Sequence, residues 1–203
     1  MLSINPIIFK TFTIVIFIVF AFFISDVRNK NTKSLIRQPW ISIMRISYPV
    51  SPLCFVYFLF KINKVSIIDI FAFLAMVFGT IIVIFAKSKL GKNHSWTGYS
   101  ATNITNFTTT GIYNYIRHPL YLGIIIAVFG TALVVFPRYD VNLTIFIIYI
   151  IGMIFTFTFI FISSKKETEF LTEKFGKEFI DYVERVPSFF PKIFSSKAKT
   201  DKN

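Results

Sequence analysis

The chain has 203 residues, of which 54% are hydrophobic and only 16% charged, and its mean hydropathy is +0.65. This composition excludes an intrinsically disordered protein and is too apolar for an ordinary soluble domain, and the single cysteine excludes a disulfide framework. The formal net charge of +12 would suggest nucleic acid in a soluble protein, but here the charges lie between long apolar runs. We therefore attribute them to membrane topology and expect no nucleic-acid partner.

Five apolar runs approach the roughly 20 residues that a helix needs to cross a bilayer. Pro49 and Pro52, within the second run, predict a kink or an unwound turn there. Because the chain lacks the repeated alternating strands of a barrel, it predicts an all-α integral membrane protein with about five transmembrane helices. The runs are 7–24, 43–60, 65–86, 120–136 and 141–162.

The connecting segments predict the orientation of these helices. Residues 25–45, residues 87–119 and the residues from 163 onward hold 18 of the 22 lysine and arginine side chains. The other four fall on the opposite side if there are five spans. By the positive-inside rule, we expect the N-terminus outside and the C-terminus in the cytoplasm, in a bacterial inner membrane or the endoplasmic reticulum.

Small residues share one face of the third run and one face of the fourth, which predicts close approach between membrane helices. The alternative is that glycine and alanine are simply common in such helices. Asp69 lies near the start of the third run, where we expect a solvated residue at a helix end. The small residues are Ala72, Ala75 and Gly79 in the third run, and Gly123, Ala127 and Gly130 in the fourth.

The chain becomes amphipathic after residue 163. Its apolar residues recur at helical spacing among charged ones, which predicts a cytoplasmic amphipathic helix. Ser164 and Glu167 fit a capping box at which this helix would restart. We expect three parts: an N-terminal membrane part (1–86), a C-terminal cofactor-binding and catalytic part (87–194), and a disordered tail (195–203). The apolar residues are Leu171, Phe175, Phe179, Tyr182 and Val186.

The first candidate for chemistry directly precedes the fourth run. Arg117 and His118 come before Pro119, a residue suited to the first turn of a helix. Helix N-termini favour anions, and an arginine can bind a carboxylate or phosphate through two donors. Tyr113, Tyr115 and Tyr121 can stack on a planar ring or line an amphipathic pocket. The alternative interpretation is a basic, aromatic belt at the membrane interface.

The second candidate segment runs from Glu167 to Pro187. Acidic groups just below a membrane helix can hold a cationic or hydroxyl-rich ligand, and the alternative is a solvated helix face. His94 and His118 are the only histidines and have no cysteine nearby, so we expect no metal site.

Together the two segments resemble the isoprenylcysteine carboxyl methyltransferase and phospholipid methyltransferase superfamily of integral membrane enzymes. The resemblance covers residues 87–191, about half of the chain. Members often have two adjacent glutamates where this chain has Glu167 and Thr168, so whether Glu169 replaces the second one stays open. The matching pattern is Leu90-Gly91, Trp96, Gly111-x-Tyr113-x3-Arg117-His118-Pro119-x-Tyr121-x-Gly123, then Glu167-x3-Leu171-x3-Phe175-Gly176-x-Glu178-x3-Tyr182-x2-Arg185-Val-Pro187, and Pro191.

The resemblance implies a methyltransferase that uses S-adenosylmethionine and acts at the membrane on a lipophilic or lipidated substrate, such as a prenylcysteine carboxylate or a lipid amine. It places Arg117 and Glu167 in the catalytic shell. Two other functions stay open: an enzyme like the NADPH-dependent isoprenoid or sterol reductases, and a non-catalytic membrane protein such as a transporter subunit or assembly factor. The cofactor-binding residues that the resemblance implies are Tyr113, Arg117, His118, Pro119, Tyr121, Gly123 and Glu167.

Overall fold

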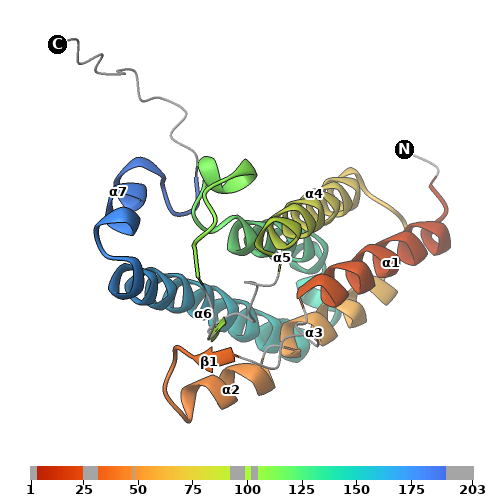
Figure 1. Ribbon diagram of the computed structural model, residues 1–203. Coiled ribbons are helices and arrows are strands. Elements are labelled where there is room, and N and C mark those ends of the chain that lie inside the picture. Colours follow the sequence, from red (N-terminus) through yellow and green to blue (C-terminus); the bar gives the residue numbers. More distant parts are fainter. Residues whose placement is uncertain (1–3, 25–31, 48, 92–98, 102–104, 191–203) are drawn as a thin grey trace.

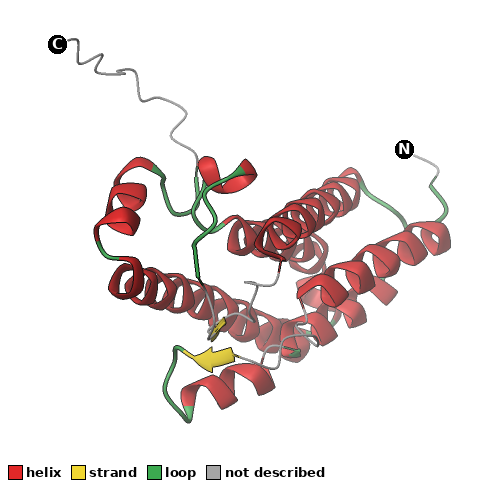
Figure 2. Ribbon diagram, in the orientation of Figure 1, coloured by secondary structure: helices red, strands yellow, loops and turns green. Residues whose placement is uncertain are grey.

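The computed structural model describes residues 4–24, 32–47, 49–91, 99–101 and 105–190. Helices dominate this part of the chain, and the short strands β1 and β2 form one antiparallel pair (Figure 2). Four helical stretches, α1, α4, α5 with η3, and α6, are long and apolar enough to span a membrane. The prediction of an all-α membrane protein is confirmed. The elements are α1 (Pro6–Ile24), β1 (Thr32–Ser34), α2 (Trp40–Ser47), α3 (Val50–Phe60), α4 (Ile67–Leu90), β2 (Tyr99–Ala101), η2 (Gly111–Asn114), α5 (Pro119–Val135), η3 (Phe136–Val141), α6 (Leu143–Phe175) and α7 (Lys177–Arg185).

The second apolar run is not one spanning helix. It is divided into α2 and α3, with Pro49 as the N-cap of α3, because a proline inside a helix removes a backbone hydrogen bond and clashes with the preceding turn. The 11 residues of α3 extend about 16 Å, roughly half of a 30 Å bilayer core. The predicted break is therefore confirmed, and the single helix over 43–60 is wrong.

The two short helices nevertheless cross the bundle together. Ile41 of α2 packs on Phe159 of α6, and Ser51 at the start of α3 lies against Gly152. Toward the end of α3, Phe58 joins a buried cluster with α6 residues still closer to the start of that helix. The contacts step backward along α6, so α2 and α3 together run antiparallel to it.

Helices α4 and α5 pack so closely that their backbones touch (Figure 1). A Cβ atom added to Gly79 would lie 2.6 Å from the carbonyl oxygen of Gly123, and one added to Gly130 would lie 2.7 Å from that of Ala72. No side chain fits at these distances, so the two small-residue faces meet each other. The domain boundary that we expected at residue 86 falls inside α4, one of the two helices in this contact.

A buried ion pair joins the start of α4 to η3, the segment that follows α5. Asp69 is fully buried, which corrects the expectation of a solvated residue. Its Oδ1 and Oδ2 atoms each lie 2.9 Å from a terminal nitrogen of Arg138 in η3. The same carboxylate also accepts hydrogen bonds from the backbone and hydroxyl of Ser66, the N-cap of α4. The beginning of α4 is thus fixed to the segment that follows α5.

Helix α6 continues through the position at which a new helix was expected. Its 33 residues extend about 50 Å, so its last turns project beyond a 30 Å bilayer core. The capping box at Ser164 is wrong, because that hydroxyl donates to the carbonyl oxygen of Phe161 within α6. The helix ends instead at Gly176, whose φ of +58° is a left-handed conformation that favours glycine.

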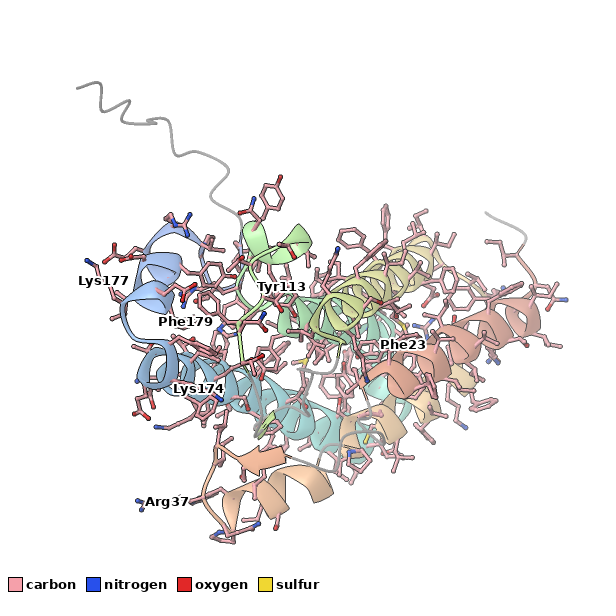
Figure 3. The ribbon with its side chains drawn as sticks, viewed as in Figure 1. Phe23, Arg37, Tyr113, Lys174, Lys177 and Phe179 are labelled. Atoms are coloured by element: carbon pink, nitrogen blue, oxygen red, sulfur yellow. The ribbon has the colours of Figure 1, made fainter. Side chains whose placement is uncertain are left out.

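Helix α7 folds back over the end of α6 (Figures 1 and 3). The amphipathic residues form one cluster around Phe107, which comes from the segment before η2. The prediction that these residues share one apolar face is confirmed. The end of α6 and α7 build this face together, and it packs against the segment before η2. Trp96, Pro191 and the tail 195–203 lie outside the described residues.

Candidate functional site

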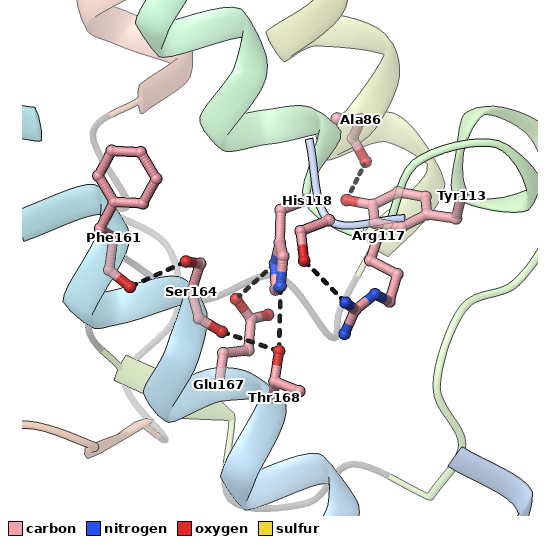
Figure 4. A network of polar contacts seen from close by, with 9 residues as sticks. Ala86, Tyr113, Arg117, His118, Phe161, Ser164, Glu167 and Thr168 are labelled. Carbon is pink, nitrogen blue, oxygen red and sulfur yellow. Dashed lines mark hydrogen bonds and ion pairs between the residues drawn. The ribbon is translucent and has the colours of Figure 1, made fainter. Parts of the chain in front are cut away.

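The site forms where α5 begins. Pro119 is its first residue, because proline needs no hydrogen-bond partner for its nitrogen and its fixed φ suits a first helical turn. His118 is the N-cap residue, with φ −122° and ψ 57°, and its side chain is only 6% exposed. This non-helical backbone turns the imidazole toward α6 (Figure 4).

Two consecutive residues of α6 bracket the His118 ring (Figure 4). Its Nε2 atom lies 3.2 Å from Thr168 Oγ1, and its Nδ1 atom lies 3.5 Å from Glu167 Oε2. The Thr168 hydroxyl donates its proton to the carbonyl oxygen of Ser164, so it accepts from His118, and Nε2 carries a hydrogen. The other edge of the imidazole, at Nδ1, therefore faces the Glu167 carboxylate.

Aromatic rings flank the imidazole. The ring of Tyr121, one turn into α5, lies 5.5 Å from it, and that of Phe189 lies 5.9 Å away. Phe189 also contacts Phe161 of α6 at 5.4 Å. The imidazole is thus held between apolar surfaces, where ionic and hydrogen-bonded contacts are stronger than in water.

Residues 186–189, here named the strap, cross the start of α5. The backbone N–H groups of Arg117 and His118 donate to the carbonyl oxygens of Pro187 and Ser188, both at 2.9 Å. The half-buried guanidinium of Arg117 adds two bonds, from Nε to the Val186 carbonyl oxygen at 2.8 Å and from Nη2 to Ser188 Oγ at 2.7 Å. Burial lowers the pKa of Arg117, but a guanidinium stays protonated at neutral pH.

Tyr113 connects the segment before α5 to helices α4 and α7. Its hydroxyl donates to the carbonyl oxygen of Ala86 in α4 at 3.5 Å, and its own carbonyl oxygen accepts from the Tyr182 hydroxyl at 2.6 Å. Burial raises the pKa of Tyr113, and the negative charge of Glu167 raises it further. Burial likewise raises the pKa of Tyr182 to about 12. Both phenols stay protonated at neutral pH and act as hydrogen-bond donors.

The structure brings most of the predicted site residues together. Arg117, His118 and Glu167 are neighbours, and Tyr121 stands beside the imidazole. Gly123 lies one turn deeper and faces α4, where an added Cβ would lie 2.7 Å from the carbonyl oxygen of Gly79. Gly123 therefore allows the backbone of α5 to approach that of α4 closely.

The position after Glu167 is filled by Thr168. Glu169 forms an ion pair with Lys166 at 2.6 Å, and its side chain is 43% exposed. That ion pair lowers the pKa of Glu169. Of the two residues that follow Glu167, Thr168 is the one that contacts His118.

Sequence reasoning missed the contacts of Thr168, Tyr182 and Ser188. The signal for Ser188 was weak: the matching pattern includes Pro187 and Pro191 but not Ser188, and a proline after an amphipathic helix indicates only that the chain becomes extended. Thr168 was noted as a departure from a pattern, and nothing in the sequence shows which ring its hydroxyl meets.

A family model described as Phospholipid methyltransferase matches residues 67–178, more than half of the chain. The match begins with α4 and ends at the start of α7, and it includes Arg117, His118, Glu167 and Thr168. The strap lies beyond it. A comparison with curated proteins gave no match.

Proposed function

The chain belongs to the phospholipid methyltransferase family, and from this premise we propose that it transfers a methyl group from S-adenosylmethionine to a lipophilic acceptor at the membrane surface. One observation carries the proposal: where α5 begins, a buried imidazole contacts a carboxylate of α6, and the arginine next to it in the chain binds the strap. In this proposal the methyl donor reaches the site from water and the acceptor from the bilayer.

The residues present fit S-adenosylmethionine. The Glu167 side chain is 33% exposed, so its oxygens can accept hydrogen bonds from ribose hydroxyls or from an ammonium group. Arg117 uses two of its five N–H donors on the strap, and the others can reach a carboxylate. Tyr121 and Phe189 offer ring faces to a planar group. Gly123, which faces α4, is left out of this proposed set.

Bound S-adenosylmethionine supplies a methyl group activated by its attachment to a sulfonium. The work of the protein is to align the acceptor with that methyl group and to exclude water. An amine acceptor releases a proton when it is methylated, and Glu167 Oε2 or His118 Nδ1 takes it up. A carboxylate acceptor releases none and needs only alignment.

We place this site on the cytoplasmic side, with the N-terminus outside. Strands β1 and β2 join the segment after α1, which carries Arg28, Lys30, Lys33 and Arg37, to the segment after α4, a helix whose last turn carries Lys87 and Lys89. At the other end of the bundle, Lys10 near the start of α1 donates to the carbonyl oxygen of Phe60 at the end of α3. The positive-inside rule assigns the β1–β2 end to the cytoplasm.

The test is transfer of an isotope-labelled methyl group from S-adenosylmethionine to membrane lipids by the full chain in bilayers. Glu167→Gln removes the charge and keeps the shape, and we expect it to lower the rate by about 100-fold or more. Glu169→Gln is the matched control, because its partner Lys166 lies outside the site. Equal rates for the wild type and Glu167→Gln, at equal protein, would remove Glu167 from the site. No labelled product with any lipid extract, despite intact folding, would overturn the proposed function.

A further inference from the structure

One buried hydroxyl in α6 has no hydrogen-bond partner in the described part of the chain. Ser163 is fully buried, and its Oγ atom makes no hydrogen bond there. Other buried hydroxyls in these helices bond to their own backbone, as Thr156 does to Gly152 and Thr80 to Met76. A buried donor without a partner is costly, so a native one needs an explanation.

The position of Ser163 suggests what that explanation is. Glu167 follows it by four residues, which places the two side chains on one helix face about 6 Å apart along the axis. Thr156 precedes it by seven residues on the same face and lines a cavity of about 40 Å³ among α1, α3, α4 and α5. Phe17, Met76 and Ala127 contribute to its mainly apolar lining. Ser163 therefore lies between the polar site and an apolar space inside the bundle.

We propose that Ser163 donates a hydrogen bond to the methyl acceptor, at the point where its polar head joins its apolar chain. The inference rests on the proposed function and narrows the acceptor class. The acceptor carries an ester, amide or phosphate oxygen on the order of 6 Å from the atom that is methylated, one helical turn toward the bilayer from Glu167.

The test compares the wild type, Ser163→Ala and Thr158→Ala as full chains in lipid nanodiscs. Thr158 is the matched control, because it is exposed on the same helix and its hydroxyl bonds to the carbonyl oxygen of Ile154. Dioleoyl phosphatidylethanolamine and N-acetyl-S-farnesylcysteine carry an oxygen near the reacting group, and oleylamine carries none.

We expect Ser163→Ala to lower kcat/KM about tenfold for the oxygen-bearing probe that is methylated, with the KM for S-adenosylmethionine unchanged. Oleylamine methylation should not change, and Thr158→Ala should match the wild type. The Tm of Ser163→Ala should not fall, since no bond of the free protein is lost. An equal loss with oleylamine, an unchanged kcat/KM for every probe, or a lower Tm would overturn the proposal.

Native mass spectrometry of the same probes separates this proposal from the proposed function. If no probe is methylated but Ser163→Ala binds the two oxygen-bearing probes more weakly than the wild type does, the Ser163 contact stands and methyl transfer fails. If probe binding is equal in the two proteins, the Ser163 contact is refuted whether or not methyl transfer occurs.

Discussion

The replacement Arg117→Ala tests whether Arg117 acts through the strap. It removes the side-chain bonds to Val186 and Ser188 and leaves the two backbone bonds of the strap in place. A hydrogen bond to a charged group contributes about 1.5–3 kcal/mol, and a half-buried guanidinium lies near the lower end because water screens it. The two bonds together hold the strap by roughly 2–4 kcal/mol. Their loss should raise the open population of the strap about 30- to 1000-fold.

Amide hydrogen exchange at residue 118 measures this opening, because that N–H donates to the Ser188 carbonyl oxygen. We expect exchange to accelerate by the same factor in Arg117→Ala. Arg117→Lys and Ser188→Ala should accelerate it less, because an ammonium cannot form the forked contact and the serine variant loses one bond. The rate of methyl transfer should fall most in Arg117→Ala and less in Arg117→Lys and Ser188→Ala. Unchanged exchange in Arg117→Ala would refute the reasoning, because the side-chain bonds of Arg117 would then not hold the strap.

Three further predictions concern the framework of the site. Gly79→Ala should lower the free energy of unfolding by about 1–3 kcal/mol, because its Cβ would lie 2.6 Å from the Gly123 carbonyl oxygen. An unchanged Tm in detergent would contradict this. Asp69→Asn should cost about 3–5 kcal/mol by leaving Arg138 without its charge partner, whereas replacing both residues with leucine should recover much of that loss in the same Tm assay. Because the pKa of Tyr182 is raised to about 12, its protonated hydroxyl contributes fully to the free energy of unfolding below about pH 10. This contribution is lost as the pH rises from about 10 to 12. Tyr182→Phe should remove that part of the alkaline loss of Tm, and an identical pH profile would show that the phenol does not contribute.

The position of the candidate site residues in the fold could be predicted from the sequence because their main features are local. Pro119 determines where α5 begins, so Arg117 and His118 had to lie at a helix N-terminus. The small residues on α4 and α5 were equally informative, because only residues without bulky side chains allow helix backbones to touch.

Other features depend on contacts between distant residues and could not be read from the sequence. The burial of Asp69 depends on Arg138, which is 69 residues away. The pattern Ser164-x-x-Glu167 matched a capping box, but a helix already in progress satisfies the same backbone groups, so no new start is needed. A strap residue such as Ser188 has no periodicity, and only the folded chain brings it to Arg117.

The threonine after Glu167 determines which group faces Nε2 of the imidazole. A second glutamate at position 168 would place a second carboxylate beside the ring. Thr168 instead offers a neutral oxygen whose proton is committed to Ser164, so it fixes a hydrogen on Nε2 without adding charge. Among the described residues, Glu167 is then the one carboxylate in contact with His118. Any proton that leaves the acceptor must be held between that carboxylate and Nδ1, which is why the charge of Glu167, and not its size alone, should determine the rate with an amine acceptor.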